Sequence, residues 1–247
     1  MPDSPAPASS DFEYDGFDLE SLAELVRYQE WILSHFRNTL KETVLELGSG
    51  SGAISEHLSK CCAELILVEP SSKHAQMLRS KFHGHDHVRI YENTLEAQLV
   101  SMPEASVDSI VMVNVLEHIE DDSDAIEQMH RALRPGGHLH IMVPALPFLF
   151  SNMDVRLGHF RRYRLKSLTS MLADAGFHIS VARYMDLIGV LPWWIINTLA
   201  GKTEFSPALV RIYDRFFVPL GKWLESAIRP PIGKNIVIVA QRRQQGV

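Results

Sequence analysis

Along the first 144 residues, hydrophobic positions switch repeatedly between continuous runs and a helical spacing. The runs are short and rich in Val, Ile and Leu, as expected for parallel strands that are buried on both faces of a sheet. Between the runs, apolar residues recur every three or four positions, which predicts amphipathic helices. The pattern therefore predicts strands within residues 43–48, 64–70, 87–93, 107–118 and 138–144, with helices between them and a turn at 134–137.

This alternation of strand and helix is typical of an α/β fold with a doubly wound, Rossmann-like parallel sheet. Right-handed crossovers place the carboxyl ends of all parallel strands at one edge of the sheet, where ligands bind in such folds. Polar residues stand at the predicted strand ends, although the strands themselves are apolar: Glu46, Glu69, Asn93 and Asn114. We therefore expect the functional site at this edge.

The last third of the chain departs from the alternation. It predicts a helix over residues 165–177 that ends at Gly176, a strand over 178–184 and a closing strand over 235–242. About fifty residues separate the two strands, far more than adjacent antiparallel strands require. We expect a mostly parallel sheet with an antiparallel last strand, preceded by a helical insertion that covers the substrate side. A long helix in this insertion is predicted to kink at Pro219.

Composition adds a few limits. The chain has 247 residues, of which 46% are hydrophobic and 22% charged, so it can bury the core of one large domain. Its net charge of −6 argues against broad nucleic-acid binding. The two cysteines, Cys61 and Cys62, are adjacent and can form neither a disulfide framework nor a CxxC metal site.

The chain start, "MPDSPAPASSD", lacks the basic region and the apolar run of a signal peptide. Residues 1–17 are predicted to be a disordered tail, and residues 18–247 a single domain with its insertion at 186–234. The longest nearly apolar run, residues 187–201, is shorter than the roughly 20 residues that a spanning helix needs. We expect a cytoplasmic protein with no transmembrane segment and at most peripheral membrane contact; the sequence leaves the oligomeric state open.

A glycine-rich loop follows the first strand. The stretch "GSGSGA" matches the dinucleotide fingerprint with Gly48, Gly50 and Ala53. Glu69, after the second strand, can accept hydrogen bonds from ribose hydroxyls of more than one kind of cofactor. Glu46 distinguishes a cofactor that carries a pyrophosphate from one that carries a cation, because its carboxylate would repel the pyrophosphate but attract the cation. Together with the acidic segment "NVLEHIEDD" after the fourth strand, it favours a positively charged ligand without phosphates over a nicotinamide dinucleotide.

At this point the chain resembles the class I S-adenosylmethionine-dependent methyltransferases, in the small-molecule branch that includes ubiquinone-type methyltransferases. The resemblance covers roughly residues 40–185 and rests on "VLELGSGSG", "LILVEPS", "NTLE", "VDSIVMVNVLEHIEDD", "LRPGGHLHIMVP" and "LADAGFHI". It implies S-adenosylmethionine as cofactor. It further implies a methionine moiety near Glu46, Gly48 and Gly50, ribose on Glu69, adenine near Asn93, Thr94 and Leu95, and Asn114 near the amino-acid end. Flanking contacts are expected from Tyr28, Ser49, Pro70 and Val115.

Two histidines are candidates for a general base, since the pKa of an ordinary histidine is about 6.5. His118 follows the fourth strand, and His159 lies in the basic stretch "GHFRRYR", which also resembles that branch. In the same stretch Arg161, Arg162 and Tyr163 are predicted to bind an anionic acceptor, because guanidinium groups clamp carboxylates or phosphates. The alternative is a solvated basic entry to a helix. A histidine-rich stretch, "HGHDH" at 83–87, is predicted to be a solvent loop, and no metal site is expected.

The sequence thus predicts an enzyme that transfers a methyl group to oxygen or nitrogen of a small organic acceptor. The tryptophans of the insertion, Trp193, Trp194 and Trp223, favour an apolar, aromatic or lipid-linked acceptor. Two alternatives remain open at this stage. One is a non-catalytic protein that binds S-adenosylmethionine, and the other is an NAD-dependent oxidoreductase.

Overall fold

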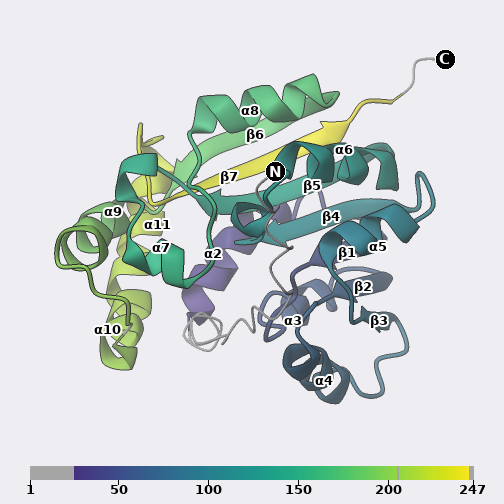
Figure 1. Ribbon diagram of the computed structural model, residues 1–247, viewed down its shortest axis with the longest axis horizontal. Helices are drawn as coiled ribbons and strands as arrows, with labels where there is room; N and C mark the ends of the chain where they lie inside the picture. Colours follow the sequence, from purple (N-terminus) through teal and green to yellow (C-terminus); the bar gives the residue numbers. More distant parts are fainter. Residues whose placement is uncertain (1–24, 205, 245–247) are drawn as a thin grey trace, which may run out of the picture.

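The computed structural model describes residues 25–204 and 206–244, and within them a seven-stranded sheet in the order β3-β2-β1-β4-β5-β7-β6 (Figure 1). All neighbouring strands run parallel except β7, which is antiparallel to both β5 and β6. The predicted fold class is confirmed; the predicted tail lies outside the described residues. The strands are β1 (Thr43–Leu47), β2 (Glu64–Val68), β3 (Val88–Tyr91), β4 (Val107–Val113), β5 (Leu133–Pro144), β6 (Phe177–Met185) and β7 (Asn235–Arg242).

Helices cover both faces of the sheet, because successive side chains of a buried strand point to opposite faces. In β1, Leu45 packs in one core with α5, α6 and α8, whereas Val44 packs in the other with α2, α3 and α4. These helices are α2 (Val26–Phe36), α3 (Ser55–Leu58), α4 (Ser72–Lys81), α5 (Leu95–Ser101), α6 (Asp122–Ala132) and α8 (Leu165–Asp174). Short helices η1 (Leu116–His118), η2 (Pro147–Leu149) and α7 (Asn152–Arg156) follow β4 and β5.

The insertion between β6 and β7 is helical, as predicted. It contains α9 (Leu187–Trp193), a π-helix η3 (Trp194–Leu199), α10 (Pro207–Ile212), a π-helix η4 (Tyr213–Phe217) and α11 (Val218–Ala227). Figure 1 shows α9, α10 and α11 gathered at one end of the molecule. No helix within the described ranges is long and apolar enough to cross a membrane.

An irregularity of the long helix lies directly before Pro219. Pro219 occupies the first turn of α11, where its missing N–H leaves no intrahelical bond broken. The carbonyl that an ordinary residue at this position would bond belongs to Arg215, in the middle of η4. A widened π-turn removes the need for that bond. The structure thus places a π-segment directly before α11, and the kink at Pro219 stays a prediction.

The predicted turn at 134–137 lies inside β5. The strand begins at Leu133, opposite Val107, and its pairing with β4 resumes at His138, opposite Ser109. The residues between leave the ladder, and Gly136 has the positive φ, +79°, that a type II turn requires after Pro135. Gly137 allows a close approach of the backbone, since a Cβ there would lie 2.8 Å from the Arg134 carbonyl oxygen.

Helix α2 ties the insertion to the sheet. The backbone N–H of Tyr28 donates to Asp214 Oδ1 at 3.0 Å, and Gly221 of α11 leaves room for the ring of Trp31. A Cβ at Gly221 would lie 3.2 Å from Trp31 Cη2. The insertion is thereby held beside the carboxyl edge of the strands, where the candidate site lies.

Candidate cofactor and acceptor site

A cavity of about 1700 Å³ lies at the carboxyl edge of the strands and continues beneath the insertion. It is lined by the glycine loop, by the ends of β2 and β4, by the segment after α7 and by α9 to η4. Of the residues predicted to form the site, all but Asn93, Arg161 and Tyr163 line it. Those that do are Tyr28, Glu46, Gly48, Ser49, Gly50, Glu69, Pro70, Thr94, Leu95, Asn114, Val115, His118, His159 and Arg162.

The loop after β1 needs its glycines. Gly48 and Gly50 have φ angles of +69° and +52°, in the left-handed region that side chains disfavour. A Cβ on Gly48 would lie only 2.4 Å from Val115 Cγ2. The loop therefore packs directly against the segment after β4, and its backbone lines the cavity.

Glu46 lies at the carboxyl end of β1 with its carboxyl group against the cavity wall. It is buried, and the Ser55 hydroxyl donates to its Oε2 at 2.5 Å. Burial, opposed by this hydrogen bond and reinforced by nearby Glu69, raises the pKa of Glu46 to about 8. The carboxyl group is thus mostly protonated at neutral pH, and a cation in the cavity would favour its ionised form.

The raised pKa of Glu46 predicts a pH-dependent stability. Between its unfolded pKa near 4.5 and its folded pKa of about 8, the folded chain holds a proton that the unfolded chain has lost. As the pH rises through this window, the free energy of unfolding of the wild type should therefore fall, relative to that of Glu46→Gln, by about 1.4 kcal/mol per pH unit. Above the window the difference should stay constant. Urea denaturation of the cofactor-free proteins at several pH values measures the difference. A difference that does not change with pH would show that Glu46 is already ionised in the folded chain.

Glu69, at the end of β2, holds the glycine loop from the other side. Its Oε2 accepts a hydrogen bond from the Gly50 backbone N–H at 2.8 Å, and its Oε1 accepts one from Ser71 at 3.0 Å. The side chain is buried and lines the cavity. Two carboxyl groups thus flank the glycine loop. Because a cation favours the ionised form of a carboxyl group, the arrangement suits a cationic nucleoside without phosphates.

The segments after β3 and β4 complete this end of the cavity. Asn114 has a φ of +54°, a conformation that asparagine tolerates better than most residues, and its N–H donates to Met142 at 2.9 Å. Thr94 caps α5, because its hydroxyl accepts from the Ala97 N–H at 3.2 Å. Asn93 is different from the expectation: its side chain bonds the Thr94 N–H and Gln98 and does not line the cavity.

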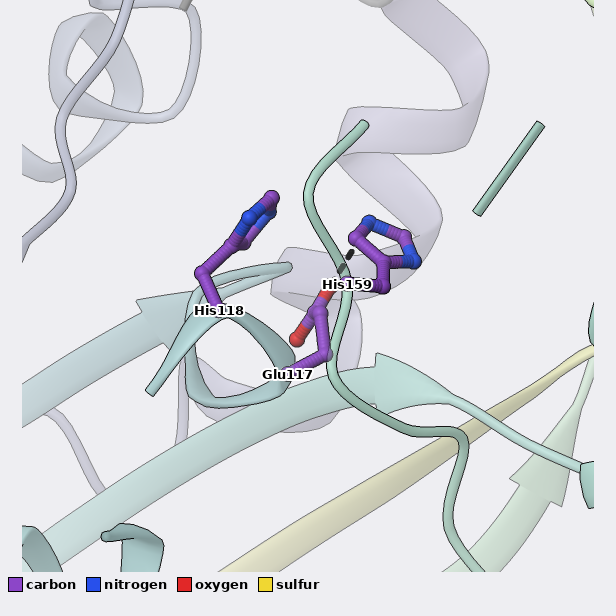
Figure 2. A group of neighbouring side chains, drawn as sticks. All are labelled: Glu117, His118 and His159. Carbon is purple, nitrogen blue, oxygen red and sulfur yellow. Dashed lines mark ion pairs between the residues drawn. The ribbon is translucent and has the colours of Figure 1, made fainter. Parts of the chain in front are cut away.

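His118 and His159 meet on the cavity wall, beside the buried Glu117 (Figure 2). Their rings pack edge to face with centroids 4.7 Å apart. His159 Nδ1 lies 3.0 Å from Asp154 Oδ1, which orients the ring. Burial and the neighbouring His159 lower the pKa of His118 to about 4, so the His118 ring is neutral at physiological pH. The chain thus presents two imidazole groups at this corner of the cavity.

The three residues predicted to clamp an acceptor all have partners within the chain, and their role toward an acceptor stays a prediction. Arg162 is buried and donates to Asp154 at 2.7 Å, so its guanidinium is occupied although it borders the cavity. Arg161 and Tyr163 lie outside the cavity lining and both contact Asp122, at 3.0 and 2.8 Å. Their polar groups hold the loop after β5 in place.

A charged cluster at the two ends of the insertion was not predicted from the sequence. Asp186 precedes α9 and Lys234 precedes β7, and their side chains form an ion pair at 3.0 Å. The Lys234 ammonium also lies over the rings of Tyr28, Tyr213 and Trp193, at 5.2, 5.5 and 5.9 Å. Lys234, Tyr213 and Trp193 line the cavity. The one feature of the sequence that could have indicated this cluster is the pair of opposite charges, Asp186 and Lys234, at the two ends of the insertion.

The family described as "Methyltransferase domain" matches residues 19–180. A protein of Mycobacterium tuberculosis named "Probable S-adenosylmethionine-dependent methyltransferase" is 30% identical over 136 residues, which are 54% of this chain and 48% of that protein. A ubiquinone biosynthesis O-methyltransferase of Alkalilimnicola ehrlichii is 25% identical over 39% of each chain. The chain thus spans about half the length, or less, of these curated relatives.

Solved structures share the fold. The chain solved in complex with the methyltransferase activator Trm112 of Haloferax volcanii superposes with a TM-score of 0.66 at 14% identity, over 96% of this chain and all of that one. A SAM-dependent methyltransferase of Archaeoglobus fulgidus superposes with a TM-score of 0.58 at 16% identity, over 89% and 94% of the two chains. At these identities the likeness concerns the architecture.

Proposed function

The chain belongs to the class I S-adenosylmethionine-dependent methyltransferases, and on this premise we propose that it methylates oxygen or nitrogen of a small organic acceptor. The observation that carries the proposal is one continuous cavity. It is lined at the sheet edge by Glu46, Glu69 and the glycine loop, and beneath the insertion by Trp193, Tyr213 and Lys234. A cofactor and an acceptor can therefore bind next to each other in one cavity.

The family resemblance assigns the cofactor residues, and their place in the cavity lining supports that assignment. Glu46 would face the positively charged end of S-adenosylmethionine, Glu69 its ribose hydroxyls, and Thr94 and Leu95 its adenine. When bound, the cofactor supplies a methyl carbon on a cationic sulfur that departs as a neutral thioether. The chain's main task is then to align acceptor and methyl carbon, and such alignment is worth about 7–11 kcal/mol. His159, held by Asp154, and His118 are the candidates to receive the acceptor's proton.

The far end of the cavity supports an acceptor with an apolar body, because aromatic rings form its walls. The Lys234 ammonium also lies there, paired with Asp186 at 3.0 Å, so an anionic group of the acceptor would share it with that carboxylate. α10 to α11 also expose a row of large apolar side chains, of which the first two line the cavity and the others lie outside it: Leu209, Ile212, Phe216, Leu220 and Trp223. Basic residues accompany them, namely Arg211, Arg215 and Lys222. An amphipathic helix of this kind lies well in the interface of an anionic membrane, which favours a lipid-linked acceptor and peripheral membrane contact.

We further propose that residues 18–247 act as one domain, in which 186–234 form a cap over the acceptor. The cap would select the acceptor, while the sheet edge would bind the cofactor. In support, the family match covers the glycine loop and ends at residue 180, before the insertion.

Calorimetry and methyl transfer test the proposal on the full-length protein. We expect S-adenosylhomocysteine to bind one per chain, and labelled methyl from S-adenosylmethionine to appear on a carboxylated phenol. A phenol bearing an isoprenoid tail, presented in anionic vesicles, should react faster than its tailless analogue. Trp223→Ser should slow only the vesicle-borne reaction, since Trp223 lies outside the cavity lining.

Failure to bind S-adenosylhomocysteine would exclude the methyltransferase function. Binding without consumption of S-adenosylmethionine, across phenols and amines with and without tails, would favour a non-catalytic binding protein. Equal rates on the tailed and tailless phenols would remove the lipid-linked acceptor but leave the enzyme.

A further inference from the structure

Glu117, His118 and His159 bring three metal-ligating groups to one point of the cavity wall (Figure 2). One ligand atom from each lies within 4.8 Å of the others, and His159 Nε2 is 3.9 Å from Glu117 Oε1. Within residues 25–204 and 206–244, this is the one place where three such groups converge. From the sequence, both histidines are expected to be bases, the "HGHDH" stretch is the metal candidate, and no metal site is expected.

Both histidines are oriented by a second partner. Asp154 Oδ1 lies 3.0 Å from His159 Nδ1, and because a carboxylate only accepts, Nδ1 carries the proton and Nε2 is left as a donor of electrons. The His118 ring is hydrogen-bonded to the backbone of Gly158, and one ring nitrogen can make this bond while the other coordinates. Histidines that bind metals are almost always held in this way, by a carboxylate or a carbonyl on the far nitrogen.

The backbone keeps the three residues together. Glu117 and His118 belong to η1, and the Phe160 N–H, next to His159, donates to the Glu117 carbonyl oxygen at 2.8 Å. The Glu117 side chain is fully buried, and buried carboxylates in proteins are paired or coordinate metals. His118 and His159 line the cavity but Glu117 does not. An ion held here would therefore keep its open coordination positions toward the cavity.

From this geometry we infer that Glu117, His118 and His159 form a binding site for a divalent transition-metal ion that activates the methyl acceptor. Two imidazoles and one carboxylate with open positions are a ligand set for Zn²⁺, Fe²⁺ and related ions rather than for Mg²⁺, which prefers oxygen. The inference rests on the proposed function and deepens it. With the ion bound, His159 is a ligand and no longer the base.

The ion would act on an acceptor hydroxyl. Coordination lowers the pKa of a bound hydroxyl or water, so that its proton leaves to solvent. The oxygen lone pair then forms the bond to the methyl carbon, while the pair of the broken carbon–sulfur bond stays on sulfur. The products are the methyl ether, the thioether and one proton, and no oxidant or reductant is needed.

Metal binding by the full-length protein tests the inference directly. After chelation and dialysis, titration with Zn²⁺, and with Co²⁺ followed by visible absorption, should show one site per chain. His118→Asn and His159→Gln should each weaken binding at least 100-fold, and Asp154→Asn about 10–100-fold, as expected for an outer-shell partner. His85→Ala, in the histidine-rich stretch, is the matched control and should bind the ion like the wild type.

Absence of a Zn²⁺ or Co²⁺ site, or an ion retained equally by His118→Asn and His159→Gln, would overturn the metal site. Full methyl transfer by the chelated wild type would overturn the inference that the ion activates the acceptor, while leaving the proposed function intact. Binding of S-adenosylhomocysteine is measured in each variant; we expect it to be unchanged, and thermal unfolding verifies that the variants are folded. Loss of nucleoside binding in the wild type would refute the methyltransferase function whatever the result with metals.

Discussion

Replacing Glu69 with alanine is expected to weaken the binding of S-adenosylhomocysteine about 100-fold or more. Hydrogen bonds to a charged group contribute about 1.5–3 kcal/mol each, and about 1.4 kcal/mol corresponds to a factor of ten in affinity. Alanine would remove the carboxylate proposed to bind two ribose hydroxyls. It would also remove the acceptor of the Gly50 N–H, which the structure places 2.8 Å from Glu69 Oε2. Isothermal titration calorimetry measures the change.

Glu92→Ala is the matched control for Glu69→Ala. Glu92 also follows a strand at the same edge of the sheet, but it bonds Ser72 and Arg79 at the surface and does not line the cavity. Its replacement should leave nucleoside affinity unchanged. Glu69→Gln, which retains an oxygen for the Gly50 N–H, should fall between the two. If Glu69→Ala bound as tightly as Glu92→Ala, the ribose role of Glu69 would be wrong.

Replacing Arg162 with methionine is expected to cost about 3–5 kcal/mol of unfolding free energy, as is usual when one partner of a buried ion pair is removed. Arg162 and Asp154 are both almost inaccessible to solvent, and their contact is 2.7 Å. The guanidinium also lies 4.5 Å from the ring of Trp193, where methionine would retain part of the packing. Urea denaturation of the cofactor-free protein measures the loss.

Two further variants separate a structural Arg162 from one that binds the acceptor. Arg79→Met, which breaks the exposed pair with Glu92, should change stability little. The double variant Arg162→Met/Asp154→Asn should lose less than the sum of the single changes, because the buried carboxylate no longer lacks its counter-charge. Unchanged stability in Arg162→Met, together with a raised KM for the acceptor, would instead support the clamp that the sequence predicted.

The sequence predicted the parts of the site that follow from local pattern. Glu46 and Glu69 stand where parallel strands end, and the crossover rule brings those ends to one edge whatever the other side chains do. The glycine loop is equally local, because Gly48 and Gly50 adopt φ angles that few other residues reach. Asn93 was misplaced because strand-end position does not set the direction of a side chain; its amide turns to the start of α5.

The sequence by itself therefore determined the architecture, the class of cofactor and the two carboxyl groups that flank its loop. Only the tertiary structure decided the partners of the charged side chains. Arg162 pairs with Asp154, Lys234 pairs with Asp186 across the whole insertion, and Glu117 lies beside His159. The physical reason is that periodicity reports which face of an element is buried, whereas an ion pair or a ligand set depends on which distant segments fold against each other.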